Sequence, residues 1–316
     1  MHKEFRFIFN QEKNGNECFF PMVTKNCADS FDPKNVRMRL VMLLCRIFWG
    51  LLLCVVPASL WGQGRPLSSR WISLDAYNDS LLLSVPTATA NPGALARQQV
   101  MALHFTGERR YMLPGLYRFQ AGGAVPSSAG GWGFMAEHER LERYSRLSAG
   151  LAYARVLYEG LQLGGVFNYT TISYAGISRV SAASMGMGML FRFSDHVRIG
   201  FHFQNAAGLR FSAGSDQVAG TVYAAGLGWD ISSLLSLSVE FVKQAYGPVQ
   251  LNAGLVYRPA QRIQVRLGVT DGVQSFFAGA GMSLKTIRFE LVSNFHPYLG
   301  SSPALRVGWV IKSKRL

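Results

Sequence analysis

The amino-acid sequence predicts an all-β fold, a transmembrane antiparallel β-barrel of about 14 strands preceded by an N-terminal plug segment. Beyond residue 97 the chain repeats one unit, in which apolar side chains alternate with polar or small ones and a turn follows. Such alternation gives a strand one apolar and one polar face. No apolar run after residue 63 approaches the roughly 20 residues that a membrane-spanning helix needs. Charged residues make up only 16% of the chain, which is low for a soluble domain.

The first 63 residues predict export. An apolar run of 14 residues at 47–60 follows Arg39 and Arg46 and precedes small residues, which is the pattern of a secretory signal peptide. Counting from Met38 gives a signal of ordinary length. We therefore expect a signal peptide at 38–63 and an upstream extension at 1–37. A membrane anchor is the alternative, although the run is short for a span.

Cysteine and charge usage exclude two classes of protein. The cysteines all precede residue 64, at Cys18, Cys27, Cys45 and Cys54. The mature chain would therefore contain none, and we expect no disulfide scaffold. The net charge is +14, but apart from the sequence KSKRL at 312–316 the basic residues are scattered. Without a basic cluster or a recognition motif, we expect no nucleic-acid partner.

Residues 64–97 lack clear alternation and are expected to form a plug or hatch segment, and residues 98–316 are expected to form the barrel. The alternating units lie at 100–105, 116–125, 131–139, 147–154, 161–169, 183–193, 196–205, 221–229, 235–241, 249–258, 262–269, 276–284, 287–294 and 304–311. Longer connections are expected near 138–144, 174–182, 205–217 and 243–248. Short turns at one rim and longer loops at the other are typical of outer-membrane barrels.

The two faces of each unit decide which side meets lipid. In ASMGMGMLFRF, at 183–193, Met185 and Met187 share one side, and Ser184 and Gly188 lie on the other. The polar sides of the units carry arginines, amides and glycines. A soluble β-sandwich is the alternative, but glycine is uncommon inside its strands. A closed barrel with its apolar face toward lipid accounts for the pattern, and inward glycines are expected where the plug crowds the wall.

Nine charged residues share the inward parity: Arg118, Arg192, Arg198, Arg258, Arg266, Arg288, Arg306, Glu240 and Glu290. One interpretation is a cationic lumen that attracts an anionic solute or a carboxylate head group. The other interpretation, which we favour, is a ladder that fills the barrel, in which the arginines pair with glutamates, with Asp75 or Asp79, and with plug carbonyls.

Four aromatic residues near the ends of apolar stretches are expected at the membrane interfaces: Trp132, Trp229, Tyr257 and Trp309. The histidines show no metal-ligand spacing, and the segment 137–140, Glu-His-Glu-Arg, is expected to be a solvated loop. We expect no enzyme activity, no metal and no cofactor.

Three stretches resemble a known family. NPGALA at 91–96 resembles the hatch motif of FadL-type outer-membrane barrels, and the resemblance assigns the hatch to Asn91, Pro92, Gly93 and Ala94. FHFQNAAG at 201–208 and LGSSPALRVGW at 299–309 resemble a strand end and the closing hairpin of Bacteroidota relatives, nearest to the PorV/PorQ-like barrels associated with type IX secretion. The resemblance covers about residues 72–311. It implies a barrel of 14 strands with an N-terminal plug, although Gly93 stands where the family usually has alanine.

Two functions fit these features. The chain is expected to be a secretion-associated shuttle or scaffold barrel, or a plugged channel, in the outer membrane of a Gram-negative cell. Its short loops favour that interpretation, and its partners would be outer-membrane lipids and secretion-system components. The alternative is a transporter of small hydrophobic or anionic solutes, which the charged lumen favours.

Overall fold

The structure is a computed structural model of the 316-residue chain, and it describes residues 70–78, 90–174, 179–205, 220–245, 248–271 and 275–311. The chain divides into two compact units, Met1–Pro57 and Ala58–Leu316. All the described residues belong to the second unit. The predicted signal peptide and upstream extension lie outside the described residues and stay predictions.

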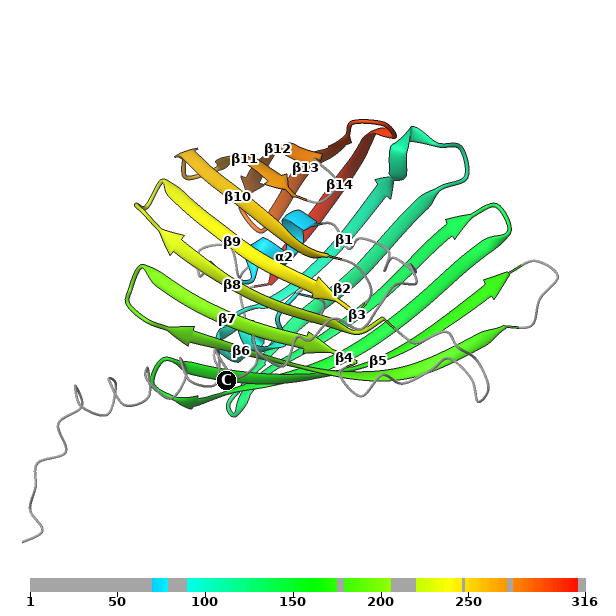
Figure 1. Ribbon diagram of the computed structural model, residues 1–316. Helices are drawn as coiled ribbons and strands as arrows, with labels where there is room; N and C mark the ends of the chain where they lie inside the picture. Colours follow the sequence, from blue (N-terminus) through cyan, green and yellow to red (C-terminus); the bar gives the residue numbers. More distant parts are fainter. Residues whose placement is uncertain are drawn as a thin grey trace, which may run out of the picture. The chain divides into compact units, whose positions relative to one another are not determined.

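The described residues form fourteen strands in one closed antiparallel barrel, which confirms the predicted fold class (Figure 1). Each strand pairs with its neighbours in the chain, and the first strand pairs with the last. The strands are β1 (Met101–Arg109), β2 (Tyr117–Ser127), β3 (Gly130–Leu141), β4 (Tyr144–Tyr158), β5 (Leu161–Tyr174), β6 (Val180–Arg192), β7 (Val197–Gln204), β8 (Val222–Asp230), β9 (Leu235–Gln244), β10 (Val249–Ala260), β11 (Ile263–Thr270), β12 (Ser275–Leu284), β13 (Ile287–His296) and β14 (Gly300–Ile311).

The barrel closes between β1 and β14. These strands are in antiparallel register from Met101 opposite Ile311 to Glu108 opposite Ala304. Closure leaves the sheet without an edge, so the backbone N–H and C=O groups find partners within the wall.

The outer face of the wall is apolar. Met185 is 66% exposed, Leu151 54% and Phe167 47%, whereas Ser184 and Asn168, on the opposite parity, are 7% and 6% exposed. A soluble sandwich would bury the apolar parity instead. The alternation in the sequence therefore correctly assigns the apolar side to the outside of the barrel.

The two rims differ in the length of their connections. At one rim, here called the short-turn rim, the connections are residues 128–129, 159–160, 193–196, 231–234, 261–262 and 285–286, and β1 begins and β14 ends there. At the opposite, long-loop rim they include 110–116, 175–179, 205–221 and 245–248. One expected long connection is wrong: β3 and β4 extend so far that only residues 142–143 separate them.

Two helical segments of the N-terminal region contact the barrel wall. The helix α2 (Arg70–Asp75) contacts β9 and β10, and Figure 1 shows it among the strands. The 3₁₀ helix η2 (Pro92–Arg97) contacts β2 to β6. A further 3₁₀ turn, η3 (Arg110–Met112), lies in the connection between β1 and β2. Within the described residues, no helix has the length and apolar character that crossing a membrane requires.

The outward position of Met187, which is 44% exposed, gives a test of lipid contact. Met187→Arg is expected to lower the free energy of unfolding by about 2–4 kcal/mol, because an arginine near the middle of a lipid-facing strand loses its hydration. Denaturant titration of the barrel in phospholipid vesicles measures this change, and Met187→Leu is the control. A wild-type chain that stays folded and monomeric in buffer without detergent would contradict the lipid-facing wall.

Candidate functional site

The candidate site is the inner face of the barrel together with α2 and η2, and its centre is a cluster of four charged side chains. Arg266 Nη1 lies 2.6 Å from Asp75 Oδ1, and Arg266 Nε lies 2.9 Å from Glu290 Oε1. Arg306 Nη1 lies 3.5 Å from Asp75 Oδ2 and 3.3 Å from Glu290 Oε2. These side chains are at most 2% exposed. Two positive and two negative charges balance, which a buried cluster requires.

Trp71 joins this charged cluster to an apolar one. The guanidinium carbon of Arg306 lies 4.0 Å from the centre of the Trp71 ring, and that of Arg266 lies 5.2 Å away. Both distances are within cation–π range. Arg266 Nη1 also donates to the Trp71 carbonyl at 3.0 Å. The helix α2 is therefore held to β11 and β14 through its backbone as well as its side chains.

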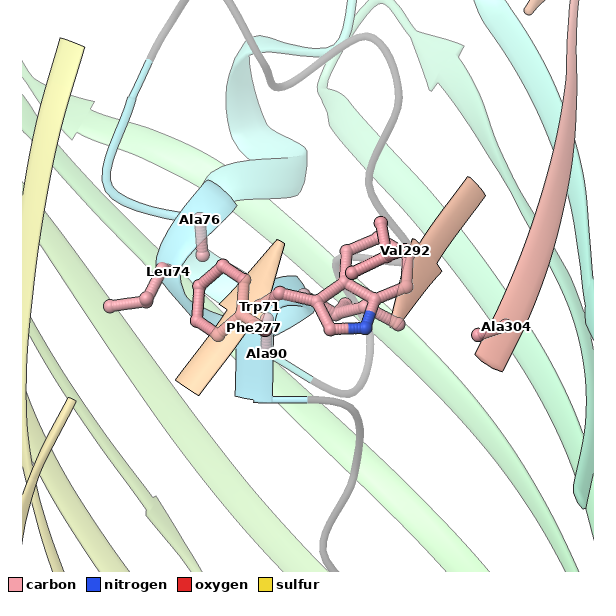
Figure 2. Close-up of a cluster of buried hydrophobic side chains, with 8 residues drawn as sticks. Trp71, Leu74, Ala76, Ala90, Phe277, Val292 and Ala304 are labelled. Atoms are coloured by element: carbon pink, nitrogen blue, oxygen red, sulfur yellow. The ribbon is translucent and has the colours of Figure 1, made fainter. Parts of the chain in front are cut away.

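The apolar cluster lies where α2 meets β12, β13 and β14. Figure 2 shows the Trp71 ring beside Val292, with Leu74 and Ala76 near Phe277. The buried members are Trp71, Ile72, Leu74, Ala76, Ala90, Phe277, Val292 and Ala304. The inner wall thus has an apolar patch, and the plug covers it.

A third contact joins the plug to Glu240 of β9. Ser73 Oγ donates to Glu240 Oε2 at 2.7 Å, Tyr77 Oη donates to Oε1 at 2.9 Å, and Asn252 Nδ2 donates to Oε2 at 3.2 Å. Burial raises the pKa of the Tyr77 hydroxyl well above its ordinary value, and the neighbouring Glu240 carboxylate raises it further. Tyr77 therefore stays protonated and keeps its role as donor.

The predicted hatch residues form the start of η2. Asn91 caps the 3₁₀ helix, since its Oδ1 accepts from the Gly93 amide at 3.0 Å, and Pro92 occupies the first turn. The same side chain binds the wall, because its Nδ2 donates to the carbonyls of Met189 and Phe201 at 3.1 and 3.2 Å. One asparagine therefore shapes the plug and fixes it to β6 and β7. Ala94 is fully buried.

A row of small residues forms the wall under η2. Gly131, Ala154, Gly164 and Gly188 lie directly opposite one another on β3, β4, β5 and β6. A Cβ atom on Gly164 would lie 2.6 Å from the Pro92 carbonyl carbon, and one on Gly188 would lie 2.6 Å from Pro92 Cδ. Side chains at these positions would therefore overlap the plug. Leu95 of η2 packs nearby in a second apolar cluster with Ala124, Met135, Ala152, Ala154 and Val166.

The remaining predicted arginines lie in different environments. Arg118 Nη2 lies 2.6 Å from Glu137 Oε2, and Arg198 Nη1 lies 2.9 Å from Asp230 Oδ2. Arg192 reaches the exposed Asp195 only at 3.9 Å.

Arg258 and Arg288 hydrogen-bond to serines. Arg258 Nη1 donates to Ser236 Oγ at 3.1 Å, and Arg288 Nε donates to Ser283 Oγ at 3.0 Å. Residues on nine of the strands take part in these contacts, so the arginines do not converge on one binding site.

The expectation of a solvated loop at 137–140 is wrong. These residues belong to β3, and Glu137 and Glu139 are 9% and 4% exposed. Glu139 Oε1 lies 2.7 Å from Arg110 Nη1, and Glu108 Oε2 lies 3.8 Å from Arg118 Nη1. The sequence-based count of seven inward arginines against two glutamates therefore misses Glu108, Glu137 and Glu139. The available signal was parity, because Glu108 shares the parity of Thr106, and Glu137 and Glu139 share that of Met135.

The four predicted interfacial aromatics all lie toward the short-turn rim. Trp132 is 47% exposed, Trp229 45%, Tyr257 44% and Trp309 53%. Each lies within three residues of the strand end at that rim. The Trp132 ring centre lies 4.7 Å from that of Tyr153 on β4.

No family model and no curated protein matches the amino-acid sequence. Many solved structures match the fold, and three of them are described next. A deltaS2 mutant of the monoaromatic hydrocarbon channel TodX matches with a TM-score of 0.55 and 8% identity, over 72% of this chain and 94% of that one. The monoaromatic hydrocarbon channel CymD matches with 0.51 and 8%, over 72% and 93%. The toluene transporter TodX of Pseudomonas putida matches with 0.50 and 8%, over 72% and 92%.

The chain has the fold of the FadL-type barrels. This likeness is one of fold alone, at 8% identity. None of these three structures is named as a PorV/PorQ-like barrel, so that finer resemblance stays a prediction.

The row of small residues under η2 gives a test with a matched control. Gly164→Ala is expected to displace η2, because the new methyl group would meet plug backbone at 2.6 and 2.8 Å. The neighbouring Gly165→Ala points outward, where the nearest atom lies at 3.9 Å, and should leave η2 in place. Limited proteolysis of the folded protein in detergent measures the displacement of η2 as faster cleavage of the plug. Equal cleavage of the plug in both variants would contradict the close contact.

The charged cluster gives a second test. Asp75→Asn leaves the guanidinium groups of Arg266 and Arg306 with one carboxylate, and breaking a buried ion pair costs about 3–5 kcal/mol. The amides of residues 71–78 are therefore expected to exchange with deuterium at least about a hundredfold faster. Asp195→Asn, which alters the exposed pair with Arg192, should change nothing. Unchanged exchange in Asp75→Asn would show that other contacts hold α2.

Proposed function

We propose that the chain is an outer-membrane channel for small apolar molecules, closed in this structure by its own N-terminal segment. The observation that carries the proposal is the chemistry of the wall beneath the plug. Phe277, Val292 and Ala304 lie under α2, and Met135 and Val166 lie near η2. Displacement of the plug elements would leave apolar side chains lining part of the interior.

The fold supports a channel for small apolar molecules. The matching structures are named as monoaromatic hydrocarbon channels and a toluene transporter, and molecules of that class are small and apolar. An outward apolar face and rims of unequal loop length are what an outer-membrane location requires. We therefore assign the chain to the outer membrane of a Gram-negative cell, with export by a cleaved signal peptide as part of the proposal.

The charges of the interior favour apolar over anionic solutes. Arg266 and Arg306 are balanced by Asp75 and Glu290, and Arg118 contacts two glutamates. Cations neutralised in this way attract an anionic solute weakly, because the approaching charge meets a cluster without net charge. The interpretation as a filling ladder thus accounts for these arginines better than a cationic lumen does.

A shuttle or scaffold role with secretion-system partners stays a prediction from the sequence. None of the contacts among the described residues favours it over a channel. The two proposals differ in a measurable way, because a scaffold need not admit any solute.

Uptake of radiolabelled toluene by Gram-negative cells tests the channel. Cells that express the chain are expected to take up toluene several-fold faster than cells without it.

Phe277→Ser should reduce toluene uptake, because a hydroxyl replaces apolar surface inside the barrel. Entry of a small polar solute should not fall. The adjacent Phe276→Ser, which alters a residue 52% exposed on the outer face, is the control. Uptake equal to that of cells without the chain would contradict the channel.

A further inference from the structure

Four arginines gather at the long-loop rim of the barrel. Arg109 ends β1, Arg140 lies near the end of β3, Arg143 lies in the connection to β4, and Arg179 directly precedes β6. All four are exposed. Arg109 and Arg140 share the parity of the lipid-facing Phe105 and Phe134. We call these four residues the outer arginine row.

The register of the strands makes this row continuous. Arg109 lies opposite Tyr117, Tyr117 opposite Arg140, and Arg140 opposite Ser145. Ser145 in turn lies opposite Ser173 of β5, whose Oγ accepts from Arg179 Nε at 3.3 Å. Arg109 and Arg140 are thus two strand spacings apart, or about 10 Å. The row crosses five neighbouring strands at one level of the wall.

No carboxylate among the described residues lies within ion-pair distance of the four guanidinium groups. Glu142 lies in the same turn as Arg143, but within the described chain no ion pair joins it to the outer arginine row. The glutamates of β1 and β3 lie on the opposite face of the same strands, where Glu108, Glu137 and Glu139 contact Arg110 and Arg118. On β1 and β3 the glutamates therefore lie on the inner face, and Arg109 and Arg140 lie on the outer face.

Aromatic rings lie directly below the row on the lipid-facing side. The ring centres of Tyr117 and Phe119 are 6.4 Å apart with nearly parallel planes, and those of Phe119 and Phe105 are 6.1 Å apart. Phe105 and Phe119 are 49% and 44% exposed. Cationic groups above an apolar aromatic surface match an amphiphile that carries phosphate above acyl chains.

The outer arginine row occupies only one part of the long-loop rim. On the same outer face toward the long-loop rim, β11 and β12 present Val269 and Phe276, which are 56% and 52% exposed. Among the described residues of β7 to β14, Lys243 is the only lysine or arginine of outward parity toward this rim. A general requirement of the rim for basic residues would place more of them there. The grouping on β1 to β6 instead indicates one binding surface.

We infer that the outer arginine row binds the phosphate groups of a phosphorylated glycolipid of the lipid A class in the outer leaflet, with its acyl chains against Tyr117, Phe119 and Phe105. The long-loop rim faces outward because short turns mark the periplasmic side of such barrels. Arginine forms charge-assisted hydrogen bonds to phosphate in a planar, two-pronged geometry, and two arginines about 10 Å apart suit a head group with two phosphates. This site is separate from the interior.

The test uses the full folded protein in detergent and native mass spectrometry with three probes: diphosphoryl lipid A, monophosphoryl lipid A and phosphatidylglycerol. The wild type is expected to retain diphosphoryl lipid A best. The double variant Arg109→Gln and Arg140→Gln should bind it roughly 25-fold more weakly, because each basic residue near a charged lipid contributes a factor of about five. The matched control, Arg155→Gln with Arg262→Gln, removes two exposed arginines toward the short-turn rim and should change affinity less than about twofold.

Each other result would overturn the inference. Equal loss of binding in the two double variants would show that lipid binding depends on net charge and not on the outer arginine row. Equal retention of phosphatidylglycerol and diphosphoryl lipid A would contradict the assignment to a glycolipid. Both variants should keep the heat-sensitive gel mobility of a folded barrel, which separates binding from folding. Toluene uptake by cells carrying Arg109→Gln and Arg140→Gln tests the interior separately, so failure of the lipid site leaves the channel proposal in place.

Discussion

The structure depends on one constraint: in lipid, every backbone N–H and C=O group needs a partner within the protein. Pairing of β1 with β14 meets this constraint by removing both sheet edges. Once the wall is closed, strand alternation divides the side chains between two environments. Met185 and Leu151 are exposed on the outside, and polar residues fall inside whether or not a function requires them there.

A closed wall creates an interior that has to be filled without leaving charge unbalanced. This barrel fills two parts of its interior in different ways. Large polar side chains, such as Arg266 and Glu290, fill the interior beside α2 and balance one another with Asp75. Beneath η2 the wall instead has glycine, as at Gly164 and Gly188, and the plug backbone takes the space. Arginine-rich and glycine-rich parts of the inner face therefore serve the same requirement for dense packing.

The sequence predicts the strands well because a period of two and regular turns are local signals, and each alternating unit corresponds to one strand. Its failures have physical causes. The segment 137–140 resembles a loop because β3 extends beyond its apolar part, where Glu137 and Glu139 face inward and His138 and Arg140 face outward. Pairs such as Asp75 and Arg266 lie 191 residues apart in sequence. The row from Gly131 to Gly188 exists only through the register of four strands, which alternation does not determine.

The partners of α2 have a consequence for biogenesis. The helix precedes every strand in the chain, yet Asp75 contacts Arg266 of β11 and Arg306 of β14. The complete set of ion pairs therefore forms only after the last strand has been delivered and has joined the first. The Asp75 carboxylate therefore has both of its arginine partners only in the finished barrel.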